Sequence, residues 1–439
     1  MHRRDVLRIA GATLASAAFP SRTRAFPGSR LAPAINAARL NSHLAALGEF
    51  GKNAAGGVSR VAYSRADLDA RAYVMGLMRE AGLAVRTDAA GNIFGRRAGR
   101  DAAATPIVFG SHVDSVPEGG NFDGQVGTTG AIEVAQALVE AGVSTAHPLD
   151  VVVWQNEEGG TWGSHLVTSD PSEAELRTLS VSGLSIHDGI VALGGDPDRL
   201  ATARLHKGDV HAYLEVHIEQ GGLLDKAGMQ IGIVEGIVGL RQWEVTVTGV
   251  ANHAGTTPMP DRHDAMLAAA RFTEMVHATV TAEPGRQVGT VGRMQAYPGA
   301  PNVIPGRVVC TLELRDLDDA HIATLFERIE RRARDIGTMN GTTFAFRDLI
   351  THESARCDPR IRRLVGDRAK ALGYTTLSLP SGAGHDAQNM ARIGPMGMIF
   401  VPSVGGISHA PKEFSTPDAI ARGASVLLET VLAVDAARF

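Results

Sequence analysis

The sequence is poor in cysteine, in aromatic residues and in any surplus of positive charge. Among its 439 residues only Cys310 and Cys357 are cysteines, and aromatic residues make up 5%. Two cysteines can form neither a disulfide framework nor a thiolate metal site, so a metal in this chain must be held by His and carboxylate side chains. Lys and Arg number 43 against 47 Asp and Glu, which argues against a nucleic-acid or anionic-membrane partner.

The rest of the composition is that of an ordinary globular protein. Hydrophobic residues make up 44% of the chain and charged residues 21%, and the length is enough for two or three domains. The 50 glycines favour a loop-rich α/β protein over a coiled coil. The 16 histidines are more than packing requires, so their positions carry information.

The first thirty residues combine a basic start with a run of small apolar residues. Residues 3–8 (Arg-Arg-Asp-Val-Leu-Arg) resemble a twin-arginine export signal. The apolar run that ends at Ala18 is too short and too rich in alanine for a permanent membrane helix. We expect export, to the periplasm, with cleavage between Ala17 and Ala25 and no membrane segment in the mature protein. A disordered basic N-terminus is the alternative, and whether the two cysteines pair after export stays open.

From about residue 31 onward, extended and helical patterns alternate. Strands are expected at 106–110, 149–154 and 212–218, and helices at 66–82 and 128–142. Such alternation favours an α/β fold with a mostly parallel sheet covered by helices.

A different pattern interrupts this alternation over residues 226–337. It is typical of a small α+β sandwich, with strands expected at 231–238, 243–250, 287–295 and 307–314 and helices at 261–280 and 320–336. The first pattern then returns, with a strand near Phe344, a helix over 360–372, a strand at 398–401 and a helix over 416–434. We expect a flexible segment over 1–30, a catalytic domain in two pieces, 31–225 and 338–439, and an inserted lid domain over 226–337.

Histidines and carboxylates follow the expected strands at their C-terminal ends. They are His112 and Asp114, Asp123, Glu157 and Glu158, His217, and His409. Open α/β sheets place their ligand crevices at this edge, so these side chains should converge. Three histidines and two or three carboxylates predict a site for two divalent ions, which would be zinc, with manganese or cobalt as alternatives.

Each of these residues also has a structural interpretation. A single His after a strand is often a hydrogen-bonded core residue, Asp123-Gly124 has the form of a turn, and Glu157-Glu158 has the form of a solvated face. The Glu pair follows the apolar residues 151–154, however, and a buried strand rarely ends in two charges without a partner. The recurrence of such residues at several strand ends favours the functional interpretation.

The motifs around these residues resemble a known enzyme family. In the catalytic pieces they are Gly-Ser-His-Val-Asp-Ser (110–115), Phe-Asp-Gly (122–124), Asn-Glu-Glu-Gly (156–159), His-Ile-Glu-Gln-Gly (217–221), Ser-Gly-Ala-Gly-His-Asp-Ala (381–387) and Ile-Ser-His (407–409). In the insert they are Asn-His-Ala-Gly-Thr-Thr-Pro-Met (252–259), Arg-His-Asp-Ala (262–265), Pro-Asn-Val-Ile-Pro-Gly (301–306) and Glu-Leu-Arg (313–315). In this order, over about residues 40–439, the chain resembles the dinuclear zinc amidohydrolases of the hydantoinase/carbamoylase family. These include N-carbamoyl-L-amino-acid hydrolases, β-ureidopropionases and allantoate amidohydrolases, and are related to zinc aminoacylases and exopeptidases.

The resemblance implies a role for each residue of the metal site. Asp123 would bridge the two ions. Four further ligands would complete the two metal spheres: His112, Glu158, His217 and His409. Glu157 would be the general base that takes a proton from the attacking water and passes it to the leaving nitrogen. The carboxylate of Asp114 would accept the second ring N–H of His112, with a plain surface role as the alternative.

The resemblance also places substrate recognition in and around the insert. His253 would donate to the oxyanion, reaching from the lid and often from the partner subunit, so a homodimer formed through the lid domain is implied. Asn302 and Arg315 would hold the α-carboxylate of a small-molecule substrate, the Arg through a bidentate fork. Gln220 would bind the ureido or amide end, and His385 would contact the substrate or support the ligands. The alternatives are a turn residue for His253 and a strand-edge charge for Arg315.

One segment departs from the family pattern. The family commonly follows Glu-Glu-Gly with Ser/Ala-Arg-Phe and a longer loop, whereas residues 158–165 here are Glu-Gly-Gly-Thr-Trp-Gly-Ser-His. The metal set and the base are unaffected, so we expect hydrolysis of a C–N bond in an N-carbamoyl amino acid or a related ureido compound. A zinc aminoacylase or dipeptidase is the alternative enzyme. A binding protein that has lost catalysis is the alternative of another class, and the complete ligand set argues against it.

Overall fold

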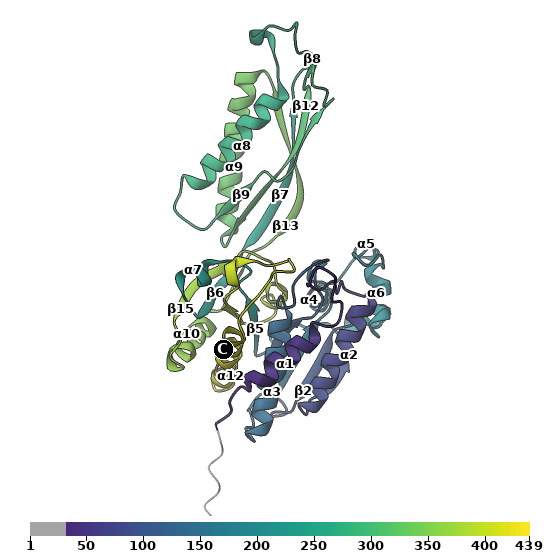
Figure 1. Cartoon of the computed structure of the whole chain (residues 1–439), viewed down its shortest axis with the longest axis vertical. Helices are drawn as coiled ribbons and strands as arrows, with labels where there is room; N and C mark the ends of the chain where they lie inside the picture. The colour runs from purple at the N-terminus through teal and green to yellow at the C-terminus, as the bar shows by residue number, and fades with distance from the viewer. Residues whose placement is uncertain (1–31) are drawn as a thin grey trace, which may run out of the picture. The chain divides into compact units, whose positions relative to one another are not determined.

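The structure is a computed structural model that describes residues 32–439 of the chain (Figure 1). The expected export signal and flexible segment, residues 1–30, lie outside these residues. Among the helices that are described, none is long and apolar enough to cross a membrane.

A nine-stranded sheet forms the larger part of the fold. Its strand order is β1-β2-β4-β3-β5-β16-β6-β14, with β15 also paired to β6. The central strands β4 (Leu149–Trp154), β3 (Ile107–His112), β5 (Ala212–Ile218) and β16 (Met396–Val401) are parallel to one another. The flanking strands are β1 (Ala84–Thr87), β2 (Ile93–Arg97), β6 (Ile231–Ile237), β14 (Ala355–Arg356) and β15 (Thr376–Ser381). Every residue of the four central strands is buried, as expected for parallel strands covered on both faces.

Helices cover both faces of this sheet. One face packs against α1 (Ala37–Leu47), α2 (Arg65–Glu80), α3 (Gln125–Glu140), α10 (Pro359–Ala371) and α12 (Pro417–Asp435), and Figure 1 shows α1, α3 and α12 side by side. The other face carries the shorter helices α4 (Trp162–Thr168), α6 (Ile186–Ala192) and α11 (Asp386–Met390). Successive residues of a strand point to opposite faces, so Val151 and Val153 lie in one core and Val152 and Trp154 in the other. Two more short helices, α5 (Glu173–Leu176) and α7 (Leu223–Ala227), connect these elements.

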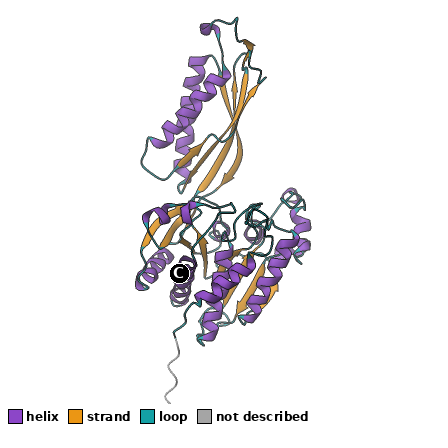
Figure 2. Cartoon of the chain, in the orientation of Figure 1, coloured by secondary structure: helices purple, strands orange, loops and turns teal. Residues whose placement is uncertain are grey.

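A second, antiparallel sheet is covered by helices on one face (Figure 2). It contains β10 (Met294–Tyr297), β12 (Arg307–Asp316), β7 (Gly239–Thr248) and β13 (Thr343–His352) in this order, with β9 (Val288–Thr290) also paired to β12. The covering helices are α8 (Ala265–Thr281) and α9 (Asp319–Asn340). Alternate residues Trp243, Val245 and Val247 of β7 pack against them. A two-stranded pair, β8 (Asn252–His253) with β11 (Val303–Ile304), completes the insert.

The fold class is confirmed: a mostly parallel central sheet flanked by helices, with a separate antiparallel α+β unit. The boundaries of the small sheet differ at both ends from the expected insert, residues 226–337. Strand β6 joins the large sheet through β15 and β16, and β13 extends the small sheet through β7. The strand expected at 287–295 is two strands, β9 and β10, with Gly292 between them. Short strands such as β15, which contains Pro380, give too weak a periodic signal to be expected from the sequence.

Candidate metal centre

Three neighbouring parallel strands deliver the central residues to one edge of the large sheet. Strand β3 ends at His112, directly opposite Trp154, the last residue of β4, and Glu157 and Glu158 follow β4. His217 is the next-to-last residue of β5. Because parallel strands end at the same edge, residues far apart in the sequence meet there.

Asp123 lies at the middle of this cluster and directs its two oxygens to different histidines. Its Oδ1 is 2.9 Å from Nε2 of His217 and 3.7 Å from Nε2 of His112. Its Oδ2 is 2.9 Å from Nε2 of His409, which in turn is 3.5 Å from Oε2 of Glu158. The side chains thus form two groups with metal-ligand spacing that share Asp123: one with His112 and His217, the other with Glu158 and His409.

The hydrogen bonding of the two buried histidines fits a bound cation. The Nδ1 atoms of His112 and His217 lie 3.1 and 2.9 Å from the backbone carbonyls of Asp114 and Ile218, so each Nδ1 carries the proton. In the neutral ring the Nε2 then presents a lone pair, and neither Nε2 has a hydrogen-bond partner. Both face Asp123 Oδ1, which is itself an acceptor, and a cation between these atoms satisfies all of them. Imidazole and carboxylate ligands suit zinc and related divalent ions.

The buried charges of the site point the same way. Burial tends to raise the pKa of Asp123, but His217, His112 and His409 outweigh it and hold that pKa well below its usual range. Burial and the charge of Asp123 raise the pKa of Glu158 to about 7. The ionised forms of these two buried carboxylates are favoured only by neighbouring positive charge, which a bound divalent cation would supply.

Glu157 is close to the ligand groups but belongs to neither of them. Its Oε2 lies 3.7 Å from Nε2 of His112, and its side chain lines the adjoining cavity. Burial, and then the charges of Asp386, Glu158 and Asp123, raise its pKa well above the usual value, although His112 opposes the shift. A carboxylate with a raised pKa at the edge of the metal centre has the properties of a general base.

Asp114 supports the site differently from the expectation. Its backbone carbonyl, at 3.1 Å, accepts the ring N–H of His112, while the nearer carboxylate oxygen is 3.6 Å away. The carboxylate instead accepts hydrogen bonds from the backbone N–H groups of Glu157 (3.3 Å) and Glu158 (3.1 Å). The side chain of Asp114 therefore orients the base and a ligand rather than the ring of His112.

Unusual backbone conformations are concentrated in the loops of the site. Asn156, Gln220 and His409 have φ values of 48°, 58° and 54°, a region that residues other than glycine occupy at a cost. Gly124, after Asp123, has φ of 75°, and a Cβ there would lie 2.3 Å from Nε2 of His112. Only glycine fits at that point beside the ring.

A cavity of about 330 Å³ opens beside Asp123, Glu157, Glu158 and His409. Three of the residues expected to bind substrate line it: Gln220, Arg315 and His385. Gln220 donates through Nε2 to Asp123 Oδ2 at 2.7 Å, and its buried Oε1 has no partner. Arg315 donates to Glu313 (2.7 Å) and to the carbonyl of Gly382 (2.8 Å).

His385 is a buried residue of the cavity wall, next to the metal centre. Its Nε2 is 2.8 Å from Ser381 Oγ, and its ring centroid is 4.4 Å from that of His217. Burial and the neighbouring histidines hold its pKa well below the usual value, so the ring is neutral. Both proposed roles, substrate contact and support of the ligands, are compatible with this place.

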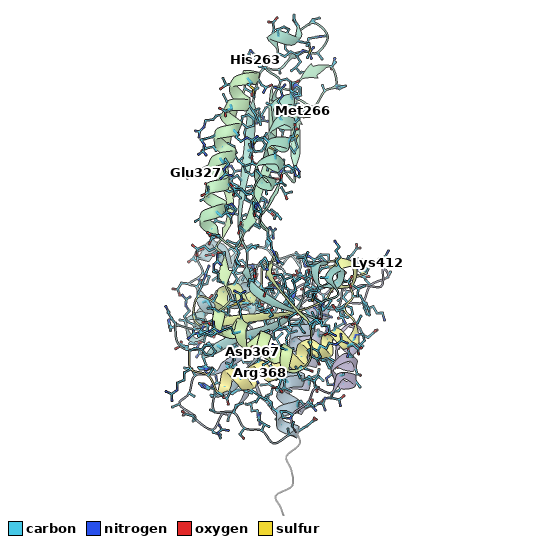
Figure 3. The ribbon with its side chains drawn as sticks, turned by 90° about the vertical axis from the view of Figure 1, so that its left-hand side faces the viewer. His263, Met266, Glu327, Asp367, Arg368 and Lys412 are labelled. Atoms are coloured by element: carbon cyan, nitrogen blue, oxygen red, sulfur yellow. The ribbon has the colours of Figure 1, made fainter. Side chains whose placement is uncertain are left out.

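His253 and Asn302 lie away from the cavity within this chain. Both are exposed, on and beside the β8–β11 pair, where the carbonyl of Asn302 accepts from the backbone N–H of Ala254. Figure 3 shows His263 and Met266 at this same end of the insert. Strand β12 begins near this pair and Arg315 is at its other end, so the two sites are on the order of 25 Å apart at the usual rise per residue. Contrary to the expectation from the sequence, Asn302 and Arg315 of a single chain therefore cannot bind the same substrate carboxylate.

Several residues of the site were not expected from the sequence. Ser164, in the segment that departs from the family pattern, donates to Asp386 Oδ1 at 2.5 Å and accepts from Asn389 at 2.9 Å. Asn389 also donates to Thr161, which lines the cavity. The cavity is further lined by His352, from β13, which no motif marked, and by Gln388, which directly follows the motif over 381–387.

The comparisons with known proteins agree with this geometry. Residues 108–433 match the family model described as peptidase family M20/M25/M40. The chain is 41% identical to an N-carbamoyl-L-amino acid amidohydrolase of Geobacillus stearothermophilus over 402 residues, covering 90% of this chain and 98% of that protein. It is 36% identical to a ureidoglycolate hydrolase of Oryza sativa subsp. japonica, covering 88% and 82%. A crystal structure of an amidase of the hydantoinase/carbamoylase family from Burkholderia multivorans superimposes with a TM-score of 0.84 at 36% identity, covering 93% and 100%.

The family model spans well over half of the chain, and these relatives are similar along nearly their whole length. The chain is therefore a metal-dependent amidohydrolase that belongs to the peptidase family M20/M25/M40.

Proposed function

We propose that the protein hydrolyses the ureido C–N bond of an N-carbamoyl-L-amino acid or a close ureido relative, with two divalent ions at the metal centre. The observation that carries the proposal is the double contact of Asp123, whose two oxygens face two separate ligand groups. The names of the similar proteins, N-carbamoyl-L-amino acid amidohydrolase and ureidoglycolate hydrolase, support the ureido substrate class.

The residues divide into ligands and a base. His112 and His217 would hold one ion, Glu158 and His409 the other, and Asp123 would contact both. When bound, the ions would lower the pKa of the attacking water and polarise the ureido carbonyl. Zinc suits this ligand set best, with manganese or cobalt as alternatives.

Glu157 would move the proton in this reaction. It would accept a proton from the attacking water and deliver it to the leaving nitrogen as the C–N bond breaks. Its burial and its place on the cavity wall suit this exchange, because it faces the space in which a substrate would bind and belongs to neither ligand group.

Two residues of the cavity wall would orient the substrate. Arg315 would hold the α-carboxylate through its guanidinium. Gln220 would bind the ureido end, since its buried Oε1 lacks a hydrogen-bond donor and a ureido N–H would supply one.

The remaining recognition residues would come from a second subunit. His253 and Asn302 are exposed at the end of the insert opposite to Arg315, and a homodimer formed through this domain would bring them to the partner's cavity. His253 would donate there to the oxyanion of the tetrahedral intermediate. We propose in addition that the protein is exported to the periplasm, on the strength of the Arg-Arg-Asp-Val-Leu-Arg sequence at residues 3–8.

Product analysis tests the proposal directly. Metal-loaded protein would be given N-carbamoyl-L-amino acids, ureidopropionate, allantoate and ureidoglycolate, with ammonia measured, beside N-acetyl amino acids and dipeptides, with free amine measured. Ammonia from a ureido compound, abolished by a chelator and restored by zinc or manganese, is the expected result. Free amine from acyl or peptide substrates alone would replace the proposal with an aminoacylase or dipeptidase.

A further inference from the structure

Glu413 is a buried carboxylate between the segments that carry Asp123 and His409. It is 4% exposed. Its Oε1 accepts hydrogen bonds from the backbone N–H groups of Phe122 (2.9 Å) and Asp123 (3.1 Å). Its Oε2 accepts from Ser408 Oγ (2.8 Å) and from the backbone N–H of His409 (3.2 Å). An ionised carboxylate accepts about four hydrogen bonds, so its capacity is filled.

These contacts join two loops that the sheet does not otherwise hold together. Asp123 precedes α3, and His409 lies in the loop between β16 and α12, so no strand pairing fixes the 2.9 Å between Asp123 Oδ2 and His409 Nε2. His409 has φ of 54°, which costs a residue other than glycine about 1–3 kcal/mol. The hydrogen bond from its N–H to Glu413 helps to keep it there.

The surroundings of Glu413 are shaped for this arrangement. A Cβ on Gly120 would lie 2.3 Å from Glu413 Oε1, so the 120–123 loop approaches the carboxylate only because residue 120 is glycine. Within residues 32–439, no Lys, Arg or His side chain forms a salt bridge with Glu413, and its charge is stabilised by backbone and hydroxyl donors alone.

We propose that Glu413 is a positioning residue for the ion that Asp123, Glu158 and His409 would hold. The inference rests on the proposed function, in which this group is one of two metal sites. The sites differ in support: His112 and His217 belong to strands β3 and β5, whereas His409 depends on a loop that Glu413 fixes. Loss of Glu413 should therefore weaken the site that contains His409 more than the site of His112 and His217, which depends on Glu413 only through the shared Asp123.

The variant Glu413→Gln tests this asymmetry. The Gln side chain has nearly the same volume as Glu, but its amide has only one acceptor oxygen. Its NH₂ group would face two of the four hydrogen-bond donors, so two of the four hydrogen bonds are lost. Metal-free protein is titrated with zinc by calorimetry, and metal content is measured by mass spectrometry after gel filtration. We expect two ions in the wild type and a 10–100-fold weaker second site in the variant, as for other residues that orient metal ligands. The Kd of the tighter site should change by a clearly smaller factor.

Glu133→Gln is the matched control. Glu133 is 1% exposed and accepts from Asn36 and Arg39, which belong to the α1 region on the helical face of the sheet. Removing this charge should lower the Tm and leave both zinc affinities unchanged. A purely structural role of Glu413 would give the same pattern.

The possible outcomes distinguish failure of the positioning role from failure of the proposed function. Two zinc sites with wild-type affinities in Glu413→Gln would overturn the positioning role, whatever the change in Tm. A wild-type protein that binds no divalent ion would overturn the proposed function instead. Should Glu413→Gln fail to fold, Ser408→Ala removes a single donor, and it should weaken the same site by a smaller factor; unchanged affinities there would equally overturn the proposal.

Discussion

The carboxylate of Asp114 accepts a hydrogen bond from the backbone N–H of Glu158, with 3.1 Å between Oδ2 and the nitrogen. The other oxygen accepts from the N–H of Glu157. These bonds follow Asn156, whose φ of 48° turns the chain at the end of β4. Asp114 therefore sets the direction in which a ligand and the base leave the strand.

Asp114→Asn should reduce activity because it disturbs the backbone at Glu157 and Glu158. The amide NH₂ would face one of the two backbone N–H groups, so one hydrogen bond becomes a repulsive contact. We expect kcat/KM to fall about 10–100-fold, the range typical for residues that orient a metal site. Steady-state kinetics on the ureido substrate measures this. The exposed Asp367 on α10, labelled in Figure 3, gives the control Asp367→Asn, which should match the wild type. Equal rates for both variants would contradict the role of Asp114.

Glu157→Gln should abolish most of the activity without loss of metal, which distinguishes the general base from the metal ligands. Glu157 belongs to neither ligand group, so the variant should retain its metal content. Removal of a general base costs about 10²–10⁴-fold, and the loss should appear in kcat. Mass spectrometry of the purified variant and turnover measurements check the two halves of this expectation. Glu158→Gln, the adjacent ligand position, should lose both metal and activity. A fully active Glu157→Gln variant would remove the base from the mechanism.

The metal-site residues at the C-terminal ends of the parallel strands could be predicted from the sequence, because their positions follow from strand geometry. His112, Glu158 and His217 each lie within a few residues of the end of a parallel strand, and parallel strands end together. A short apolar run followed by a charged residue is visible in a single sequence. The same reasoning gives the fold class, because alternation of strands and helices determines how the layers are covered.

Other features of the site and fold depend on contacts between distant residues, which produce no recognisable pattern in the sequence. Glu413 lies 290 residues after Asp123 and follows no strand, so nothing in the local sequence marks it as a partner of that residue. Whether the carbonyl or the carboxylate of Asp114 meets His112 depends on a single loop conformation. The placement of β13 in the small sheet depends on pairing with β7, about a hundred residues earlier in the chain.

Mixed dimers should reveal whether His253 serves the neighbouring subunit. His253→Ala and Glu157→Gln are each expected to be nearly inactive. If His253 acts in the partner's cavity, a mixed dimer contains one site with both residues intact. Random mixing at equal amounts then gives about one quarter of the wild-type rate, since half of the dimers are mixed and each has one good site. Activity is measured after the two variants are unfolded and refolded together. No recovery would place His253 and Glu157 of one chain in the same site, and a fully active His253→Ala variant would place His253 outside it.

His321 should make the stability of the insert depend on pH. Its Nδ1 lies 2.6 Å from Asp316 Oδ2 and its Nε2 3.2 Å from Glu283 Oε2, so both nitrogens donate when the ring is charged. The hydrogen bond to Asp316 raises the pKa of His321 above its usual 6.5, against a smaller opposing effect of burial and with further support from Glu283. A pKa that is raised in the folded state means that the contribution is complete below about pH 6.5 and is lost as the pH rises through the folded-state pKa.

The variant His321→Gln measures this contribution. It should lower the free energy of unfolding by about 1 kcal/mol at pH 6, the size of a partly exposed ion pair, and by less at pH 9, where a smaller fraction of the wild-type ring is charged. Urea unfolding at both pH values gives the difference. His277→Gln, an exposed position on α8 of the same insert, is the control and should change stability equally little at both. A destabilisation of His321→Gln that is the same at pH 6 and pH 9 would show that the imidazole contributes through packing, because only the charged ring can donate to Asp316 and Glu283 together.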